Sequence, residues 1–459
     1  MKQIRTPSLI VATLALLFSA MYAAPAPDMR QWKAGAAAVD ITPEKPVLMA
    51  GYATRTTPSE NVMQKLYAKA VAMEDMLGAR VVWVTLDLIG TPRWLRDEVE
   101  RKSFEKYKLH PESILLNSSH THTGPSPKGG RVLGTSTDPN NNTEMYGEKL
   151  AQNIVKAIGD ALAKLEPATL RYSHARAGFA MNRRAPVGTS FGNSPYPDGP
   201  VDHDVPVLSV TGKDGKLRAL VFGYACHNTA TGRYNFISAD YAGYAQEYLQ
   251  EKRPGVVALF MMGTGGDQNA YPRHDPAHEL PKHHGRTLAY AVEAALSVAE
   301  QRQLAGPLRS SYGYATLDFV DTSKADLERR ARSKNAAEKK RAEDLLEQVN
   351  AGKELAKTYP CPVQVVQFGN DLTLVAIGGE TTVDYSLRIK RELGGGKPAI
   401  WVAGYSNDVF GYLGGKKVIV EGGYEGYSSN MTRHPGPLGS NTEERIIGKM
   451  YELIRMINH

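Results

Sequence analysis

The sequence predicts a mixed α/β protein, of the α/β or α+β class, built as a single large domain around a mixed β-sheet. Short apolar runs of strand length alternate with amphipathic stretches of helical period from residue 35 to residue 457. Several of the apolar runs end in glycine, histidine or acidic residues, as strands do when they end at a binding site. No internal repeat interrupts this alternation.

Composition narrows the choice of partner. The chain has 459 residues and a formal net charge of +7. No run of lysine and arginine is interleaved with aromatic residues, so we expect no nucleic acid partner. Only Cys226 and Cys361 are present, which means that the fold depends on its core rather than on a disulfide framework. Whether these two cysteines pair stays open on the sequence.

Residues 1–24 have the features of a secretory signal peptide. Lys2 and Arg5 give a positive start, Leu9 to Phe18 form a short apolar core, and Ala23 and Ala24 offer a cleavage point. We therefore expect a mature chain of residues 25–459 that is secreted, or periplasmic in a Gram-negative host. After removal of the signal, no segment approaches the apolar length of a transmembrane helix.

The expected elements of the first half follow from apolar runs and helical periods. We expect strands over 35–43, 66–73, 80–88 and 112–116, and helices over 93–107 and 144–164. Gly78 lies between the second and third strands and predicts a hairpin there. The second helix carries apolar residues at helical spacing and stops before Pro167.

The second half is read in the same way. We expect strands over 170–173, 205–211, 217–225, 256–262, 363–368, 372–377 and 399–403, and helices over 241–252, 285–302 and 441–457. Asp214-Gly215 and Asn370-Asp371 are hairpin turn signals between neighbouring strands. The polar segments 126–142 and 186–204 predict long loops. The segment from about 322 to 357 is highly charged and predicts a solvated helical hairpin, inserted into the domain and without a binding role.

Two histidines follow the strand expected over 112–116, in the motif Ser119-His120-Thr121-His122-Thr123-Gly124-Pro125. On extended backbone, residues i and i+2 face the same side, so both imidazoles would project together. Such a pair is either a metal chelate or a metal ligand beside a catalytic helper. Two histidines in an ordinary polar loop are the alternative.

Three other strands end in residues that can bind a metal or a substrate. His227 follows the strand over 217–225, Asp267 lies in the glycine-rich loop after 256–262, and Glu380 follows 372–377. Because strand ends of an α/β sheet meet at one edge, their shared placement predicts a common site. Each residue alone could instead be a cap or a hydrogen-bonded group at a strand end.

These motifs together resemble the neutral/alkaline non-lysosomal ceramidase family, in its N-terminal catalytic domain. The resemblance is carried by Gly35 to Pro43 with Gly51, Ser119 to Pro125, Asn182-Arg183, Cys226 to Thr229, Gly266-Asp267, the segment around Glu380, and Gly404 to Gly426. The motifs occur in family order over most of the chain, and the HTHTGP element is the most specific of them. The resemblance implies the family's fold and a zinc-dependent hydrolase that cleaves an amide, or N-acyl, bond with zinc-activated water.

The resemblance also implies roles for particular residues. One catalytic zinc ion would be held by two imidazoles, a carboxylate and a phenol, from His120, His227, Glu380 and Tyr412. His122 and Tyr424 would stabilise an oxyanion or pass a proton to the leaving group. Arg183 would anchor a polar or anionic part of the substrate, with a structural ion pair as its alternative.

Two departures from the family concern the substrate. In the family, the Gly-Asp loop carries a serine two residues after the aspartate, whereas Asn269 stands two residues after Asp267 here. An amide cannot be a nucleophile of this kind, so a serine-based mechanism is disfavoured, and we expect Asp267 and Asn269 to bind substrate. The family also has an immunoglobulin-like C-terminal domain, whereas we expect residues 25–459 to form one hydrolase domain without it.

Three functions remain open on the sequence. The first is hydrolysis of an N-acyl compound, either a lipid or a small polar molecule. The second is a carbohydrate esterase or deacetylase on the same zinc site, because Asn193, Tyr196 and Asp198 in the polar loops would suit a saccharide. The third is a non-catalytic binding protein, which the presence of all four expected zinc ligands disfavours.

Overall fold

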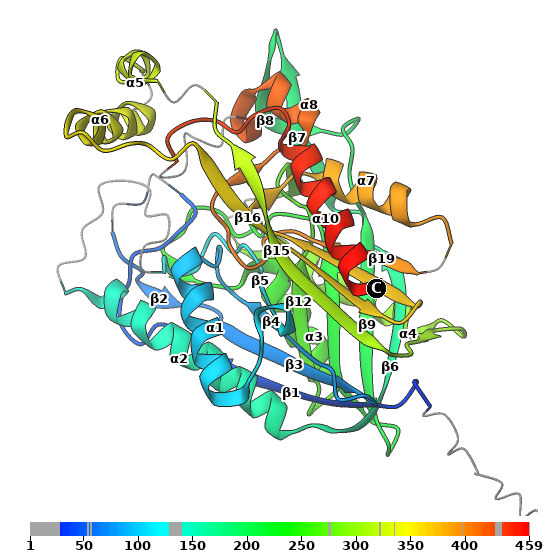
Figure 1. Cartoon of the computed structure of the whole chain (residues 1–459). Helices are drawn as coiled ribbons and strands as arrows, with labels where there is room; N and C mark the ends of the chain where they lie inside the picture. The colour runs from blue at the N-terminus through cyan, green and yellow to red at the C-terminus, as the bar shows by residue number, and fades with distance from the viewer. Residues whose placement is uncertain are drawn as a thin grey trace, which may run out of the picture.

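The structure is a computed structural model that describes residues 28–52, 55, 57–127, 140–273, 277–320, 323–334, 336–396, 398–426 and 434–458. The expected signal peptide over 1–24 and most of the expected loop over 126–142 lie outside these residues. Strands and helices mix along the whole described chain, which confirms the mixed α/β class (Figure 1). In the described ranges, no helix is long and apolar enough to span a bilayer.

Most strands of the described residues belong to two sheets. The large sheet contains β1 (Trp32–Asp40), β3 (Tyr67–Asp75), β4 (Arg80–Leu86), β5 (Ile114–Ser118), β6 (Glu166–Arg176), β9 (Asp204–Gly212), β10 (Leu217–Tyr224), β12 (Val257–Met262) and β14 (Arg302–Gln303). The second sheet contains β15 (Leu308–Asp318), β16 (Thr358–Phe368), β17 (Leu372–Ile377) and β19 (Ala399–Ala403). Small sheets pair β2 (Asn61–Val62) with β11 (Phe236–Ile237), β7 (Ala180–Val187) with β8 (Ser190–Tyr196) and β13 (Gln268–Ala270), and β18 (Glu380–Thr381) with β20 (Tyr412–Leu413).

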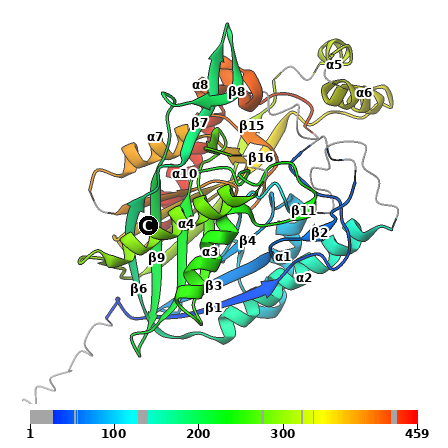
Figure 2. The same ribbon diagram turned by 180° about the vertical axis from the view of Figure 1, so that it is seen from behind.

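The helices of the described residues are α1 (Arg93–Tyr107), α2 (Asn142–Ala163), α3 (Asp240–Lys252), α4 (Glu279–Ser297), α5 (Lys324–Arg330), α6 (Ala336–Asn350), α7 (Val383–Leu393), α8 (Lys416–Glu421), α9 (Gly423–Gly426) and α10 (Thr442–Asn458). Six of the helices, α1, α2, α3, α4, α7 and α10, lie on the outer faces of the two larger sheets, whereas α5 and α6 stand apart at one corner (Figures 1 and 2). A short 3-10 turn, Pro111–Ser113, precedes β5. Helices α5 and α6 pack together within the segment 322–357, where the sequence predicts a charged helical hairpin.

The two larger sheets pack face to face and form the main core. The ring of Trp83 on β4 lies 5.6 Å from that of Phe368 on β16 and 5.9 Å from that of Trp401 on β19, all between ring centres. Helices α1 and α2 cover one half of the large sheet, α3 and α4 cover the other half, and α7 and α10 cover the second sheet. The protein is therefore a four-layer sandwich, with helices outside both sheets.

Parallel strand pairs deliver chain segments to one end of this sandwich. β4 pairs with β5, β10 with β12, and β17 with β19, each pair parallel. These strands read as continuous apolar runs because both faces of each are buried. Their carboxyl ends point in the same direction within each pair, so the loops that follow them meet at one edge.

Asn117 joins the two edges of the large sheet. The sheet begins at β12 and ends at β5, so these are its edge strands. The Asn117 amide accepts from the Met262 N–H at 2.7 Å and donates to the Met262 carbonyl at 3.1 Å. It also donates to the Gly404 carbonyl at 2.8 Å. One buried side chain thus holds the ends of β5, β12 and β19 together, and the candidate site lies at this junction.

Some elements differ from the expectation. The expected loop over 186–204 contains β8, the helix expected over 285–302 is Glu279–Ser297, and β15 and α7 were not predicted. β15 and β8 are rich in Ser, Gly and Tyr and lack an apolar alternation, so periodicity does not reveal them. Cys226 and Cys361 are both buried free thiols, so the pairing left open by the sequence does not occur.

Candidate metal centre

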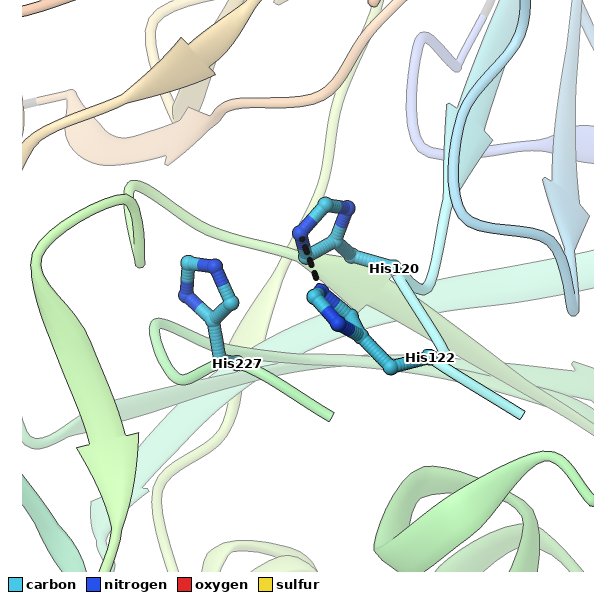
Figure 3. Close-up of side chains that lie close together, drawn as sticks. All are labelled: His120, His122 and His227. Atoms are coloured by element: carbon cyan, nitrogen blue, oxygen red, sulfur yellow. Dashed lines mark hydrogen bonds between the residues drawn. The ribbon is translucent and has the colours of Figure 1, made fainter. Parts of the chain in front are cut away.

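Three histidines from two loops converge at the junction of the strand ends. His120 and His122 follow β5, and His227 follows β10. One ring nitrogen from each lies within 4.8 Å of the others, and Figure 3 shows the three rings turned toward one another. His120 and His227 are buried, whereas His122 is partly exposed and so lies on the solvent side of the centre.

The HxH pair comes together by a different route from the one expected. His120 has a φ of +63°, in the left-handed region, so its backbone is not extended. The Nε2 atoms of His120 and His122 are nevertheless 3.0 Å apart. The loop is held by the His120 N–H, which donates to the Leu88 carbonyl at 2.9 Å, and by the His122 N–H, which donates to the Asn228 carbonyl at 3.2 Å. Hydrogen bonds to neighbouring loops, rather than strand geometry, set the positions of the two rings.

Backbone carbonyls fix the tautomers of two of the three histidines. His120 Nδ1 lies 2.6 Å from the Ile89 carbonyl, and His227 Nδ1 lies 2.7 Å from the Gly265 carbonyl. A carbonyl oxygen can only accept, so both Nδ1 atoms must carry a proton and donate it. When these rings are neutral, their Nε2 atoms have no proton and present lone pairs to the centre. This support through Nδ1 is common among histidines that bind metals.

A carboxylate shares this centre. Glu380 Oε2 lies 3.2 Å from His120 Nε2 and 3.6 Å from His227 Nε2. Two ligands of one tetrahedral ion, each at about 2.0–2.2 Å, are separated by about 3.3–3.6 Å. The observed separations therefore match the spacing of ligands around a single cation. Without a cation, two imidazole lone pairs would face a carboxylate in a buried space, which is electrostatically unfavourable.

Burial keeps two of the histidines, His122 and His227, neutral. It lowers the pKa of His227 to about 3, with the nearby Arg183 guanidinium as a further cause. Burial, together with the neighbouring His120 and His227 rings, also holds the pKa of His122 well below its usual value. A neutral imidazole is the form that binds a metal ion, so the electrostatics of the centre agree with its geometry.

Tyr412 lies next to Glu380 through a short parallel pairing. The residues pair in register between β18 and β20, and the Tyr412 ring stacks 6.4 Å from the His227 ring. Arg183 Nη2 donates to the Tyr412 hydroxyl at 2.8 Å. Burial holds the pKa of Tyr412 well above its usual value, and Arg183 opposes that rise.

Arg183 itself is buried and fully engaged with protein groups. Its Nε donates to Glu425 Oε1 at 2.8 Å, and its other nitrogens donate to Tyr412, to Asn269 Oδ1 at 3.2 Å and to the Gly266 carbonyl at 2.8 Å. The side chain is 4% exposed. This geometry corresponds to the structural ion pair that the sequence left open as the alternative to a substrate anchor.

The glycine-rich loop after β12 brings Asp267 and Asn269 to the same region. The Asn269 amide oxygen accepts from Arg183, which leaves its Nδ2 buried without a hydrogen-bond partner among the described residues. Asp267 is turned away from the centre: Oδ1 accepts from the Val383 N–H at 2.9 Å, at the start of α7, and Oδ2 from Asn182 Nδ2 at 3.2 Å. Burial, followed by the charge of Asp384, raises the pKa of Asp267 to about 7.

Tyr424 lies on the solvent-exposed side of the centre. It lies on α9, is 44% exposed, and packs its ring 5.3 Å from that of Tyr412. The Arg183 guanidinium lies 5.8 Å from the centre of the Tyr424 ring. All the residues expected at the site therefore lie in one connected cluster. Asp267 and Arg183 contact protein groups within it and are shielded from solvent.

Several site residues were not recognised in the sequence. Asn228 donates to the Ser119 carbonyl and accepts from the Ala242 N–H at 3.1 Å, so it ties both histidine loops to α3. Tyr405 packs beneath the metal ligands expected from the sequence, with its ring 4.5 Å from that of His120. Asn228 and Tyr405 lie inside motifs that carry the family resemblance. Their place in those motifs was the sequence signal that could have identified them as site residues.

Comparison with known proteins identifies the family. A family model described as "Neutral/alkaline non-lysosomal ceramidase, N-terminal" matches residues 32–269, which include His120, His122 and His227. The chain belongs to this ceramidase family. Glu380, Tyr412 and Tyr424 lie beyond the matched residues.

Curated relatives of this ceramidase family are distant in sequence. Neutral ceramidase B of Dictyostelium discoideum is 26% identical over 255 residues, which cover 51% of this chain and 35% of the relative. The neutral ceramidase of Drosophila pseudoobscura pseudoobscura is 25% identical over 259 residues, covering 51% and 36%. The matched part of the chain thus spans about a third of the length of these relatives.

The fold extends beyond the part that the sequences share. The crystal structure of neutral ceramidase from Pseudomonas aeruginosa superimposes with a TM-score of 0.71 and 20% identity, covering 92% of this chain and 74% of that one. A second ceramidase structure, described as complexed with C2, gives a TM-score of 0.70 at 19% identity. These likenesses establish that the whole described domain has the fold of the ceramidase.

Proposed function

We propose that the chain is a zinc-dependent hydrolase that cleaves an amide bond in an N-acyl substrate. The observation that carries the proposal is the convergence of the Nε2 atoms of His120 and His227, whose Nδ1 atoms donate to backbone carbonyls, on the Glu380 carboxylate. Nitrogen and oxygen donors at this spacing suit zinc, which favours imidazole and carboxylate ligands in tetrahedral sites. Membership of the ceramidase family supports an amide as the bond that is cleaved.

In this proposal, His120, His227, Glu380 and Tyr412 hold the ion. A zinc ion bound by them supplies Lewis acidity and lowers the pKa of a bound water. Arg183 positions the phenol, because its Nη2 donates to the Tyr412 hydroxyl at 2.8 Å. The Arg183 charge favours the phenolate form of Tyr412, in which an oxygen ligand is most effective.

His122 and Tyr424 act on the substrate in this proposal. His122 is the partly exposed histidine of the three, and its pKa is depressed, so it is neutral at physiological pH and able to exchange a proton. The Tyr424 ring lies against that of Tyr412 on the solvent-exposed side of the centre. Its hydroxyl can donate there to a substrate oxygen that gains negative charge during the reaction. The buried Nδ2 of Asn269 is a further donor for a polar group of the substrate.

The relatives favour an amide over the alternatives. Those compared above are described as ceramidases, and no feature of the described residues favours a saccharide over an N-acyl compound. The intact set of expected ligands also favours an enzyme over a binding protein that has lost its chemistry. We therefore place an N-acyl amide, lipid or small, ahead of an acetylated sugar as the substrate.

We further propose that the protein is exported, with residues 1–24 as a cleaved signal peptide. The support is the charged start and apolar core of that segment. N-terminal sequencing of protein recovered from the periplasm or the culture fluid should begin at residue 25. Recovery of the uncleaved chain from the cytoplasm alone would contradict export.

The function is tested by metal analysis followed by hydrolysis assays. We expect about one zinc ion per chain, and turnover of a fluorogenic ceramide or of a short N-acyl amide ahead of an acetylated sugar. His120→Ala should lose both zinc and turnover, whereas His110→Ala, at an exposed surface histidine, should keep both. Zinc bound equally well by the His120→Ala variant would overturn the proposed site. A preference for acetylated sugars would replace the amidase with an esterase.

A further inference from the structure

Two arginines, Arg233 and Arg273, lie near Tyr52, whose ring packs against that of His122. Arg233 is exposed and Arg273 is partly exposed, and neither forms an ion pair within the described part of the chain. Arg233 lies six residues after His227 on the same loop, and Arg273 lies four residues after Asn269. Both charges act on Tyr52, so each of these two loops carries a positive charge near the residue that packs against His122.

Tyr52 lies between Arg233 and His122 and contacts both. Its ring contacts the His122 ring at 5.1 Å between centres, and the Arg233 guanidinium lies over the same Tyr52 ring at 5.6 Å. These two lengths place the guanidinium carbon within about 11 Å of the centre of the His122 ring. A contact between the guanidinium group and an anionic oxygen takes up to about 4 Å of this length. The remainder corresponds to only a few covalent bonds between the anionic group and a scissile bond beside His122.

A third arginine holds this border in place. The buried Arg55 donates to the carbonyls of Ala50, His122 and Tyr234, with distances of 2.6 Å to the last two. It therefore ties the loop of Tyr52, the loop of His122 and the segment that carries Arg233 to one another. The backbone next to Arg233 is therefore held to that of His122 by partly buried hydrogen bonds from Arg55.

The charges around Tyr52 are unbalanced. Burial and the Asp240 carboxylate raise the pKa of Tyr52 to about 12, while Arg55, Arg273 and Arg233 oppose the rise. Asp240 is fully buried, and its carboxylate accepts from the N–H groups of Thr231 at 2.8 Å and Tyr241 at 2.6 Å. Among the described residues it forms no ion pair with either outer arginine, so three arginine charges face one carboxylate around Tyr52. An anion entering from solvent would meet a positive border of the site.

We propose that Arg233 and Arg273 bind an anionic oxygen group of the substrate, so that the preferred substrate is an N-acyl amide bearing a carboxylate or similar oxyanion close to the scissile bond. An N-acyl amino acid has this arrangement, because its carboxylate is separated from the amide nitrogen by a single carbon. The inference rests on the proposed amide hydrolysis and specifies its substrate class. A neutral N-acyl amide would leave both guanidinium groups without a partner.

The test compares two substrates that differ only in charge. N-octanoylglycine carries a carboxylate, and N-octanoylglycinamide replaces it with a neutral amide of similar shape. We expect the zinc-loaded enzyme to favour the anion by about tenfold or more in kcat/KM, and added salt should reduce this ratio. Arg233→Gln and Arg273→Gln should each lower the ratio by about threefold to tenfold, mainly through KM, and the double variant should bring it close to one.

Arg309→Gln is the matched control, since Arg309 is exposed on β15, outside the candidate site. It should leave the ratio unchanged. A second measurement does not depend on turnover: calorimetry of N-octanoylglycine with chelator-treated protein should show binding that weakens in the double variant. Hydrolysis of both compounds with equal kcat/KM, or a preference that survives in the double variant, would overturn the anion site alone. Hydrolysis of neither compound nor of any other amide would instead contradict the proposed function.

Discussion

The Nε2 atoms of His120 and His122 lie 3.0 Å apart, yet the two rings are supported differently. His120 Nδ1 donates to the Ile89 carbonyl at 2.6 Å, whereas His122 Nδ1 is buried without a hydrogen-bond partner among the described residues. A ligand needs a fixed tautomer and a fixed ring, while a proton-transfer group needs freedom to change its protonation. The pair therefore divides into a metal ligand and a catalytic helper.

This division predicts different outcomes for the two alanine variants. His120→Ala should weaken zinc affinity by at least about a hundredfold, because it removes a ligand. His122→Ala should keep zinc affinity within about tenfold and should lower kcat by about a hundredfold or more. Zinc titration against a competing chelator, together with steady-state kinetics, measures both. An equal loss of zinc in the two variants would mean that all three histidines bind the ion.

Gly51 sets the space available to the His122 ring. A Cβ at this position would lie 2.7 Å from the Cβ, Cγ and Nδ1 atoms of His122, and Gly51 has a φ of +101°. Gly51→Ala should therefore displace His122, and we expect kcat to fall by about tenfold or more while zinc is retained. Kinetics and metal analysis on the same preparation check this outcome.

Gly78→Ala is the matched control for that variant. Gly78 also has a positive φ, +85°, but a Cβ there would meet no atom within 4 Å. Both variants should lose about 1 kcal/mol of unfolding free energy through backbone strain, measured by urea denaturation. Only Gly51→Ala should lose activity. A similar loss of activity in Gly78→Ala would show that strain rather than the clash is responsible.

The sequence predicted the framework of the site because strand ends carry a local signal. Helix α1 was predicted with its observed limits, and His120, His227 and Glu380 were each placed at the end of a buried apolar run. Such runs are buried on both faces, so they stand out without knowledge of the tertiary structure. The left-handed conformation of His120 was not predictable, because a non-glycine residue gives no local sign of it.

Residues that act across loops were the ones that the sequence did not reveal. Tyr52 and Arg55 lie in an irregular segment far from the histidines in the chain, and only the folded structure brings them against His122. Arg183 was predicted at the site, but its contacts with Tyr412 and Glu425 depend on segments more than 200 residues away. The position of a residue in a motif predicts that it lies at the site, but it does not predict which distant residues it will contact there.

Asn117 is expected to be among the most sensitive polar residues outside the metal centre. It is fully buried, and Asn117→Ala would leave the Met262 N–H and the Gly404 carbonyl without this partner at the junction of three strands. We expect a loss of about 3 kcal/mol or more in the free energy of unfolding, measured by urea denaturation. Asn193→Ala, at an exposed position on β8, should change it by no more than about 0.5 kcal/mol. Equal effects in the two variants would show that the side chain does not hold the sheet edges together.

His174 and Asp204 give the protein a pH-dependent contribution to stability away from the site. His174 Nδ1 lies 2.8 Å from Asp204 Oδ1, on the neighbouring strands β6 and β9. The hydrogen bond to Asp204 raises the pKa of His174 above its usual value, although burial, Lys390 and Arg302 oppose the rise. Lys390 also donates to Asp204 Oδ2 at 3.0 Å, and the pKa of Asp204 is lowered. The carboxylate therefore stays charged over the pH range in which His174 titrates.

The sign of the effect follows from the raised pKa. The folded state binds the His174 proton more tightly than the unfolded state does, so the contribution is fully present below the unfolded pKa of about 6.5 and is lost as the pH rises through the folded value. His174→Gln should therefore reduce the urea midpoint at about pH 5.5 more than at about pH 8.5. His110→Gln is the control for the loss of an exposed histidine that forms no ion pair among the described residues. A His174→Gln effect that is equal at both pH values, or larger at the higher one, would contradict this assignment.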